Sequence, residues 1–390
     1  MKRFYVYIGL VFITVMLTAC GRDKMTAEGE NKKGLGYYES GDYQTAREYF
    51  ERALSIESSN KEVLNNYGMA LIQLKENDLA LEQFGKVIDG NSSKKLMKFA
   101  YRGQGIAYMQ KLDFQNALDS FVNALEIDSE SGWDIDILYY KANAQECLGQ
   151  VDEAIATYTA VLEEDKDNLL TLRSRGNLYR EKKEYEKALA DYRAILDAES
   201  DDYHAYIGMY RVYCDMNETD KASTTLEKAS HLKIRDNEDK YLLGQVHFYQ
   251  KNYTSAKIEM TNAVENGFSE AYFFLGEIAM AEEEYEQAIE YYEKYRVGIV
   301  TVSPTVCNQE AVCYLALFNY DKAEEMINLG LSFGSSSARQ QLMRNRIAML
   351  EGRYDLMGAY NAFQEYIVEF PSDSEAIQEY KFVKKRLGFE

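Results

Sequence analysis

The chain has 390 residues, a formal net charge of −20 and 28% charged residues. An acidic surface of this size opposes nucleic-acid binding, which depends on neutralising phosphates. The charge either steers basic partners to the protein or only keeps it soluble. The two prolines among 390 residues indicate a nearly all-helical chain.

The first element is an N-terminal targeting segment. Lys2 and Arg3 precede an apolar run from Phe4 to Leu17, shorter than the roughly 20 residues of a membrane-spanning helix. This pattern predicts a secretory signal peptide over residues 1–19. An ordinary signal peptide and an uncleaved anchor are the alternatives, and both would also direct the chain across a membrane.

The segment Leu17-Thr18-Ala19-Cys20 resembles the lipobox of bacterial lipoproteins. The resemblance implies cleavage before Cys20, acylation of that cysteine with palmitate or a similar chain, and a short tether over residues 20–26. We therefore expect a lipid-anchored protein on the extracytoplasmic side of the bacterial cell membrane, or of the outer membrane where the host has one.

From residue 27 onwards an alanine recurs every 32 to 37 residues. The series is Ala46, Ala80, Ala117, Ala154, Ala188, Ala222, Ala256, Ala288 and Ala323. A large apolar residue follows each alanine by four positions, and a second small residue often precedes it by twelve, as Gly34 precedes Ala46. This spacing predicts two helices per unit, packed closely where the small residues lie.

The order of small and aromatic residues resembles the tetratricopeptide repeat family. The resemblance implies an all-α solenoid of about ten helix–turn–helix units over residues 27–373, forming a right-handed superhelix. Residues 374–390 are expected to form a capping helix. Proteins of this kind bind partners in the concave groove lined by the first helix of each unit.

Applied to this sequence, that geometry predicts a partner-binding groove in the middle units. Its residues are Tyr139, Asn143, Arg173, Asn177, Arg180, Arg211, Tyr241, Gln245 and Phe248. Arginine and asparagine side chains suit a carboxylate or an extended peptide backbone.

Alternatives stay open for the predicted groove residues and for the single tryptophan. The arginines could pair with acidic neighbours such as Glu146, Glu181 or Asp215. The rings of Tyr241 and Phe248 could pack between repeats. An insertion near Trp133 could either expose this single tryptophan as an anchor or fold it over neighbouring helices.

The sequence lacks P-loop, GxSxG and HExxH motifs, so we expect no enzyme activity, cofactor or metal site. Apart from Cys20, the cysteines at 147, 214, 307 and 313 are predicted to be small helix-packing residues. We expect a non-catalytic scaffold that binds a protein or peptide partner at the cell envelope. A part of an export or assembly machine, such as exopolysaccharide or pilus secretion, is the alternative.

Overall fold

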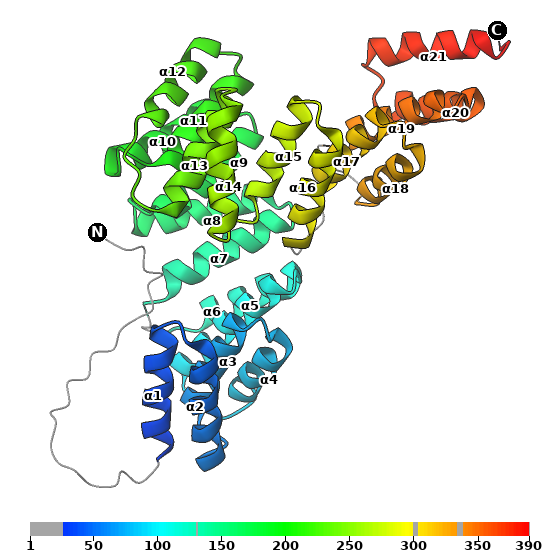
Figure 1. The fold of residues 1–390 in the computed structure, drawn as a ribbon. Helices are drawn as coiled ribbons and strands as arrows, with labels where there is room; N and C mark the ends of the chain where they lie inside the picture. Colours follow the sequence, from blue (N-terminus) through cyan, green and yellow to red (C-terminus); the bar gives the residue numbers. More distant parts are fainter. Residues whose placement is uncertain (1–25, 130–131, 299–302, 334–337, 390) are drawn as a thin grey trace. The chain divides into compact units, whose positions relative to one another are not determined.

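The structure is a computed structural model that describes residues 26–129, 132–298, 303–333 and 338–389. Within these ranges every regular element is an α-helix (Figure 1). The predicted signal peptide, the lipobox and Cys20 lie outside the described residues.

The helices follow one another as ten pairs and a closing helix. In chain order they are α1 (Ala27–Glu39), α2 (Tyr43–Ile56), α3 (Lys61–Gln73), α4 (Asn77–Ile88), α5 (Lys94–Gln110), α6 (Phe114–Glu126), α7 (Asp134–Cys147), α8 (Val151–Glu164), α9 (Leu169–Glu181), α10 (Tyr185–Ala198), α11 (Tyr203–Asp215), α12 (Thr219–Ser230), α13 (Asn237–Tyr249), α14 (Tyr253–Glu265), α15 (Ala271–Ala281), α16 (Tyr285–Gly298), α17 (Pro304–Ala316), α18 (Tyr320–Leu331), α19 (Arg339–Gly352), α20 (Leu356–Glu369) and α21 (Ser374–Arg386). The all-α solenoid of helix pairs expected from the sequence is confirmed.

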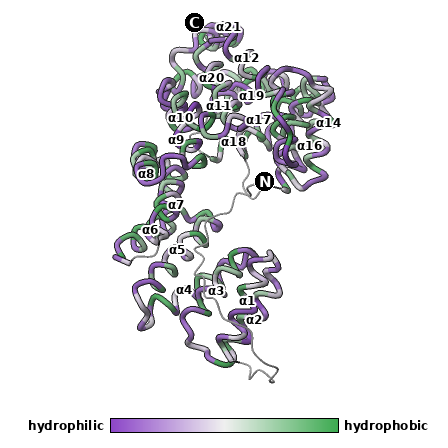
Figure 2. The backbone as a smooth tube through the Cα atoms, turned by 90° about the vertical axis from the view of Figure 1, so that its left-hand side faces the viewer, coloured by the Kyte–Doolittle hydropathy of each residue, from purple (hydrophilic) through white to green (hydrophobic). Residues whose placement is uncertain are grey.

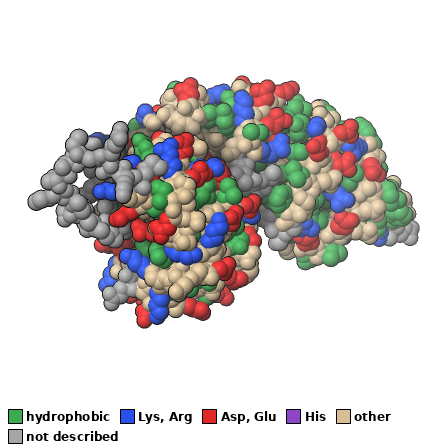
Figure 3. Space-filling model, turned by 90° about the horizontal axis from the view of Figure 1, so that it is seen from below, with side chains coloured by type: hydrophobic (Ala, Val, Ile, Leu, Met, Phe, Trp, Pro, Cys, Tyr) green, Lys and Arg blue, Asp and Glu red, His purple; other side chains and the backbone are tan. Residues whose placement is uncertain are grey.

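The chain forms two compact units, Met1–Val212 and Tyr213–Glu390. The boundary falls within α11. In the other pairs the two helices lie side by side, and the helices on either side of each connection between those pairs are also in contact (Figure 1). Hydrophobic and hydrophilic residues alternate along the helices (Figure 2), as expected for helices that bury one face. Acidic and basic side chains are interspersed on the face shown in Figure 3.

The alanine series marks where the second helix of each pair packs. Eight of the nine alanines have no exposed surface, and Ala222 is 4% exposed. The large residue four positions later, such as Phe50 or Tyr192, is also fully buried in most pairs. The regularly spaced alanines and the large residues four positions later therefore mark the buried face of the second helix in each pair.

Small residues on the first helix leave space for these large side chains. A β-carbon built on Gly34 would lie 2.6 Å from the ring of Phe50, and one on Gly105 would lie 2.4 Å from Phe121. Neither position can hold a larger residue without moving a buried ring. The glycines thus set how closely the two helices of a pair approach.

The turn inside each pair contains one residue with a left-handed backbone, five positions before the alanine. Glycine takes this position at Gly41 and Gly149, as its freedom at positive φ allows. The other eight turns have Lys75, Leu112, Lys183, Asn217, Lys251, Glu283, Phe318 and Tyr354 there, with φ between 56° and 62°. The close packing of the flanking helices holds these side chains in a conformation that costs about 1 kcal/mol or more.

The cysteines divide into two groups. Cys307 and Cys313 on α17 are fully buried, in agreement with a packing role. Cys147 and Cys214 are exposed free thiols, so their predicted packing role is wrong. Both lie in the last turn of a first helix, α7 and α11.

Candidate functional site

The surface of the first helices is partly built by tyrosines from the second helices. In three pairs the large buried residue is a tyrosine whose hydroxyl reaches a polar side chain of the first helix. The hydrogen bonds run from Tyr158 to Glu146 (3.1 Å), from Tyr192 to Asn177 (2.7 Å) and from Tyr292 to Glu277 (2.6 Å). Each bond fixes a carboxylate or amide on the first helix.

The positive charges of three arginines act on one of these hydroxyl groups in the first unit. Burial raises the pKa of Tyr192 to about 12, while the positive charges of Arg180, Arg211 and Arg173 act in the opposite direction. Arg173 and Arg180 belong to α9 and Arg211 to α11, so the first helices of two adjacent pairs supply the three positive charges that act on Tyr192. Asn177 lies among them because it accepts the hydrogen bond of Tyr192.

Arg173 is only partly paired within the protein. Its Nη2 lies 4.0 Å from Oδ2 of Asp202, and its buried Nε has no hydrogen-bond acceptor among the described residues. Two positions further on, Arg175 binds both oxygens of Asp191 at 2.9 and 2.7 Å. Arg175 is thus a structural arginine, whereas Arg173 keeps donor capacity.

The neighbouring helix α7 extends this group. Burial raises the pKa of Tyr139, and the side chains of Ser174 and Asn143 and the charge of Arg173 act in the opposite direction. Tyr139, Asn143 and Arg173 are all half-buried. Each of them therefore keeps part of its surface exposed.

We call this group the arginine site. It consists of Tyr139, Asn143, Arg173, Asn177, Arg180 and Arg211, all of them predicted from the sequence. Glu146, on the same helix as Tyr139, is one of the acidic residues expected to pair with an arginine. Burial raises the pKa of Glu146, and it accepts a hydrogen bond from Tyr158.

The other three predicted groove residues lie in the second unit and take part in packing. Tyr241 stacks on Phe268 with ring centroids 5.4 Å apart, and Phe248 lies edge-to-face with Phe274 at the same separation. Gln245 is buried, with 7% of its surface exposed. The packing alternative therefore accounts for these rings, and contact with a partner stays a prediction.

The insertion near Trp133 joins two helix pairs. The Trp133 indole lies edge-to-face with Phe99 of α5, with ring centroids 4.9 Å apart. Beside it, Lys98 pairs with Asp134 and Arg102 with Asp136. Both cations are more than nine-tenths buried, so this segment connects α5 to α7 and Trp133 is folded over its neighbour.

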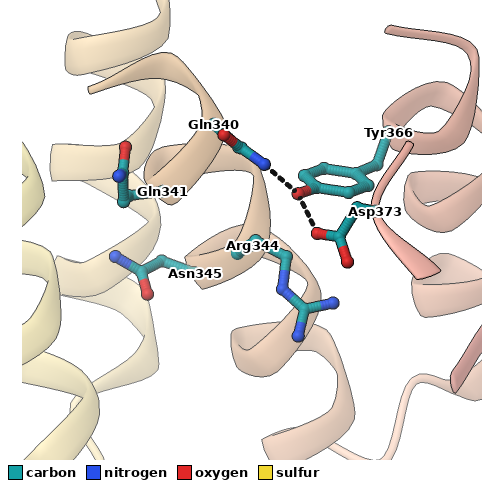
Figure 4. A pocket seen from close by; sticks show the side chains of 6 residues that line it. All are labelled: Gln340, Gln341, Arg344, Asn345, Tyr366 and Asp373. Carbon is teal, nitrogen blue, oxygen red and sulfur yellow. Dashed lines mark hydrogen bonds between the residues drawn. The ribbon is translucent and has the colours of Figure 1, made fainter. Parts of the chain in front are cut away.

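A polar hollow of about 290 Å³ lies in the second unit between α19, α20 and the start of α21 (Figure 4). On one side Gln340 donates to the hydroxyl of Tyr366 at 2.9 Å, and this hydroxyl donates to Asp373 at 2.6 Å. On the other side Figure 4 shows Gln341 and Asn345, with Arg344 between the two sides. Its residues can donate to and accept from a peptide group.

These hollow residues were not predicted from the sequence. A signal is present, because Gln341 and Asn345, like Gln340 and Arg344, are four positions apart and share a face of one helix. Asn345 also donates to Asn308 of the preceding first helix at 2.9 Å. An equivalent bond joins Asn66 of α3 to Asn31 of α1 at 3.0 Å. Amide pairs thus connect the first helices in both units.

Comparison of the sequence with protein families decides which family these helix pairs represent. Two sequence models described as tetratricopeptide repeat match the chain, one at residues 37–89 and 179–234, the other at residues 139–203 and 241–299. Together they cover more than half of the 390 residues. The chain belongs to the tetratricopeptide repeat family.

Several solved structures resemble this tetratricopeptide repeat protein. The Cut9 and Hcn1 hetero-tetramer of APC/C matches with 14% identity over 92% of this chain and 90% of that one, at a TM-score of 0.46. A tetratricopeptide repeat protein from Parabacteroides merdae matches with 18% identity over 74% and 98%, at 0.45. PilF of Pseudomonas aeruginosa matches with 20% identity over 55% and 96%, at 0.41. A comparison with curated proteins gave no match.

The matched segments include the arginine site and the aromatic packing around Tyr241. The hollow at α19 lies beyond them, although it is built from the same alternation of first and second helices. The tetratricopeptide repeats therefore supply a regular framework, and the polar side chains on the first helices differ from unit to unit.

Proposed function

We propose that this tetratricopeptide repeat protein is a non-catalytic scaffold that holds a protein or peptide partner on its first helices. Recognition centres on the arginine site, where an acidic side chain or a terminal carboxylate of the partner binds. The observation that carries the proposal is the incomplete pairing of Arg173, whose Nη2 lies 4.0 Å from Asp202 and whose Nε lacks an acceptor among the described residues. Beside it, the charges of Arg180 and Arg211 also act on Tyr192.

The chemistry of the site fits a carboxylate better than a neutral group. Guanidinium groups donate paired hydrogen bonds to carboxylates, and such charge-assisted bonds are about twice as strong as neutral ones. Among the described residues the only ion pair of Arg173, to Asp202, is long at 4.0 Å, so its terminal nitrogens retain donors for an incoming acceptor. The half-buried Tyr139 and the amides of Asn143 and Asn177 add donors for the adjoining main chain.

The test is cross-linking in intact cells followed by identification of the captured protein. We expect one or a few partners to be lost in the Arg173→Gln, Arg180→Gln, Arg211→Gln triple variant, while the helical circular dichroism stays unchanged. Arg193→Gln is the control, because Arg193 is exposed on a second helix, α10. Capture of the same partners by the triple variant would contradict the proposal. A captured export component would assign the protein to such a machine.

We further propose that Cys20 anchors the protein to the outer face of a bacterial membrane. Support comes from the lipobox-like segment Leu17-Thr18-Ala19-Cys20 after an apolar run. No helix in the described part of the chain is long and apolar enough to cross a membrane. With Cys20→Ala, we expect labelled fatty acid to be absent from the protein and the precursor to accumulate. Normal labelling and processing of this variant would exclude the anchor.

A further inference from the structure

The closing helix α21 has a basic and aromatic outer face near its C-terminal end. Its inner face packs on the preceding helices through Ala376 and Val383, which are 0% and 2% exposed. On the opposite face Phe382 is 62% exposed. The exposed cations Lys381, Lys385 and Arg386 lie around this ring. We call these four residues the terminal patch.

The cations of the terminal patch are not paired with acidic side chains of the described residues. No ion pair involves Lys381, Lys385 or Arg386 in any of the four described ranges. On α19, by comparison, Arg344 pairs with Glu379 and Arg346 with Glu365. Lys384 on the flank of α21 adds a fourth positive charge within six positions of an acidic chain. The patch thus presents a local positive charge to its surroundings.

Apolar surface accompanies this charge. The guanidinium of Arg386 lies 5.8 Å from the centroid of the Phe382 ring, and Phe389, just beyond the helix, is 40% exposed. Cations at the C-terminal end of a helix are favoured by the helix dipole, which gives Lys385 and Arg386 a structural reason. The helix dipole does not explain why Phe382, one turn before these two cations, is exposed.

We propose that the terminal patch binds the surface of an anionic phospholipid membrane. A phenylalanine ring can enter the boundary between headgroups and acyl chains, and lysine and arginine side chains extend to the phosphates. Each basic residue close to such a surface strengthens binding about fivefold. Acidic side chains more than about 8–10 Å from the patch oppose this contact weakly, because their charges are screened at physiological salt. Glu379, two positions before Lys381, is paired with Arg344.

This contact is independent of the arginine site and of Cys20. The test uses the chain from Gly21 onwards, which contains every described helix and lacks the acylated cysteine. The probe is sedimentation with vesicles of phosphatidylcholine alone or with phosphatidylglycerol added, at low and high salt. We expect binding only to the anionic vesicles, with weaker binding at high salt.

Substitutions within the terminal patch test whether these residues cause the vesicle binding. Lys381→Gln with Lys385→Gln should weaken binding to anionic vesicles about 25-fold, from two losses of about fivefold. Phe382→Ser should reduce the binding that remains at high salt. The control pair is Lys228→Gln with Lys240→Gln, since both lysines are exposed on α12 and α13 and the charge change is equal. The control should bind as the unmodified chain does.

Two results would overturn the proposal. One is equal binding by the patch variant and the control pair. The other is self-association of the vesicle-free chain that disappears in the patch variant without any vesicle binding. That result would assign the patch to an acidic protein surface instead of a lipid surface.

Discussion

At the residue scale, the carboxyl group of Glu310 has a pKa well above the usual value for glutamate. Glu310 on α17 has no exposed surface. One of its oxygens accepts a hydrogen bond from Nε of Arg296 at 3.1 Å, and Oε2 has no partner among the described residues. Burial raises its pKa to about 7 from a usual value near 4.5, Arg296 acts in the opposite direction, and Glu293 and Glu325 add to the increase. The folded protein therefore binds this proton more tightly than the unfolded chain does.

This difference predicts a pH-dependent stability. The contribution of Glu310 is fully present below pH 4.5 and is lost as the pH rises through about 7. We expect the free energy of unfolding to fall by at most about 3 kcal/mol across this window because of Glu310. Urea unfolding followed by circular dichroism at several pH values would measure the decline.

The variant Glu310→Gln isolates this effect, because glutamine does not titrate. Its unfolding free energy should fall less between pH 5 and pH 8 than that of the unmodified protein. The same slope in both proteins would show that Glu310 does not titrate in this range. Other carboxylates with raised pKa values, such as Glu146 and Glu351, are shared by both proteins and cancel in the comparison.

At the scale of elements, glycines and rings set the distance between paired helices. The β-carbon of an alanine at 105 would lie 2.4 Å from the ring of Phe121, which has no exposed surface. We therefore expect Gly105→Ala to lower the free energy of unfolding by about 1–3 kcal/mol. Chemical denaturation followed by circular dichroism measures this loss.

A matched glycine separates packing from helix propensity. Gly85 in α4 also lies within a helix, but a β-carbon there would meet no atom within 4 Å. Gly85→Ala should stabilise the protein by up to about 1 kcal/mol, because alanine favours helices. If the two substitutions had the same effect, close packing at Gly105 would not be the cause.

At the scale of the whole molecule, stability depends on contacts between neighbouring pairs. Helices contact their own pair and the adjoining pairs, and the chain forms two compact units. In such arrays stability is approximately a sum of unit and nearest-neighbour contributions. A destabilising substitution in one helix pair should therefore lower the stability of that pair and of the pairs that contact it, but not of distant pairs.

Hydrogen exchange can detect this local response. Gly105→Ala lies in the first unit, so exchange should become faster in α5, α6 and the adjoining pairs. The helices α17 to α20 of the second unit should exchange as in the unmodified protein. Faster exchange throughout the chain would indicate a single cooperative core instead.

The sequence by itself determined the repeating architecture. The alanine series and its companions depend on local geometry, since residues four and seven positions apart share a helix face whatever surrounds them. That register also placed Arg173, Asn177 and Arg211 together. For the turns within the pairs, a glycine signal is present in the sequence only at Gly41 and Gly149. The other eight turns have non-glycine residues with positive φ, which the packing of the flanking helices holds in place.

Only the tertiary structure decided how individual side chains are used. Arg173 and Arg175 are two positions apart in the sequence, and yet Asp191 occupies one and leaves the other with an unused donor. Tyr241 packs on Phe268 and Phe248 on Phe274. Trp133 likewise packs on Phe99. Such outcomes depend on partners from other helices, and a periodic pattern gives the face of a residue but not the neighbour it meets there.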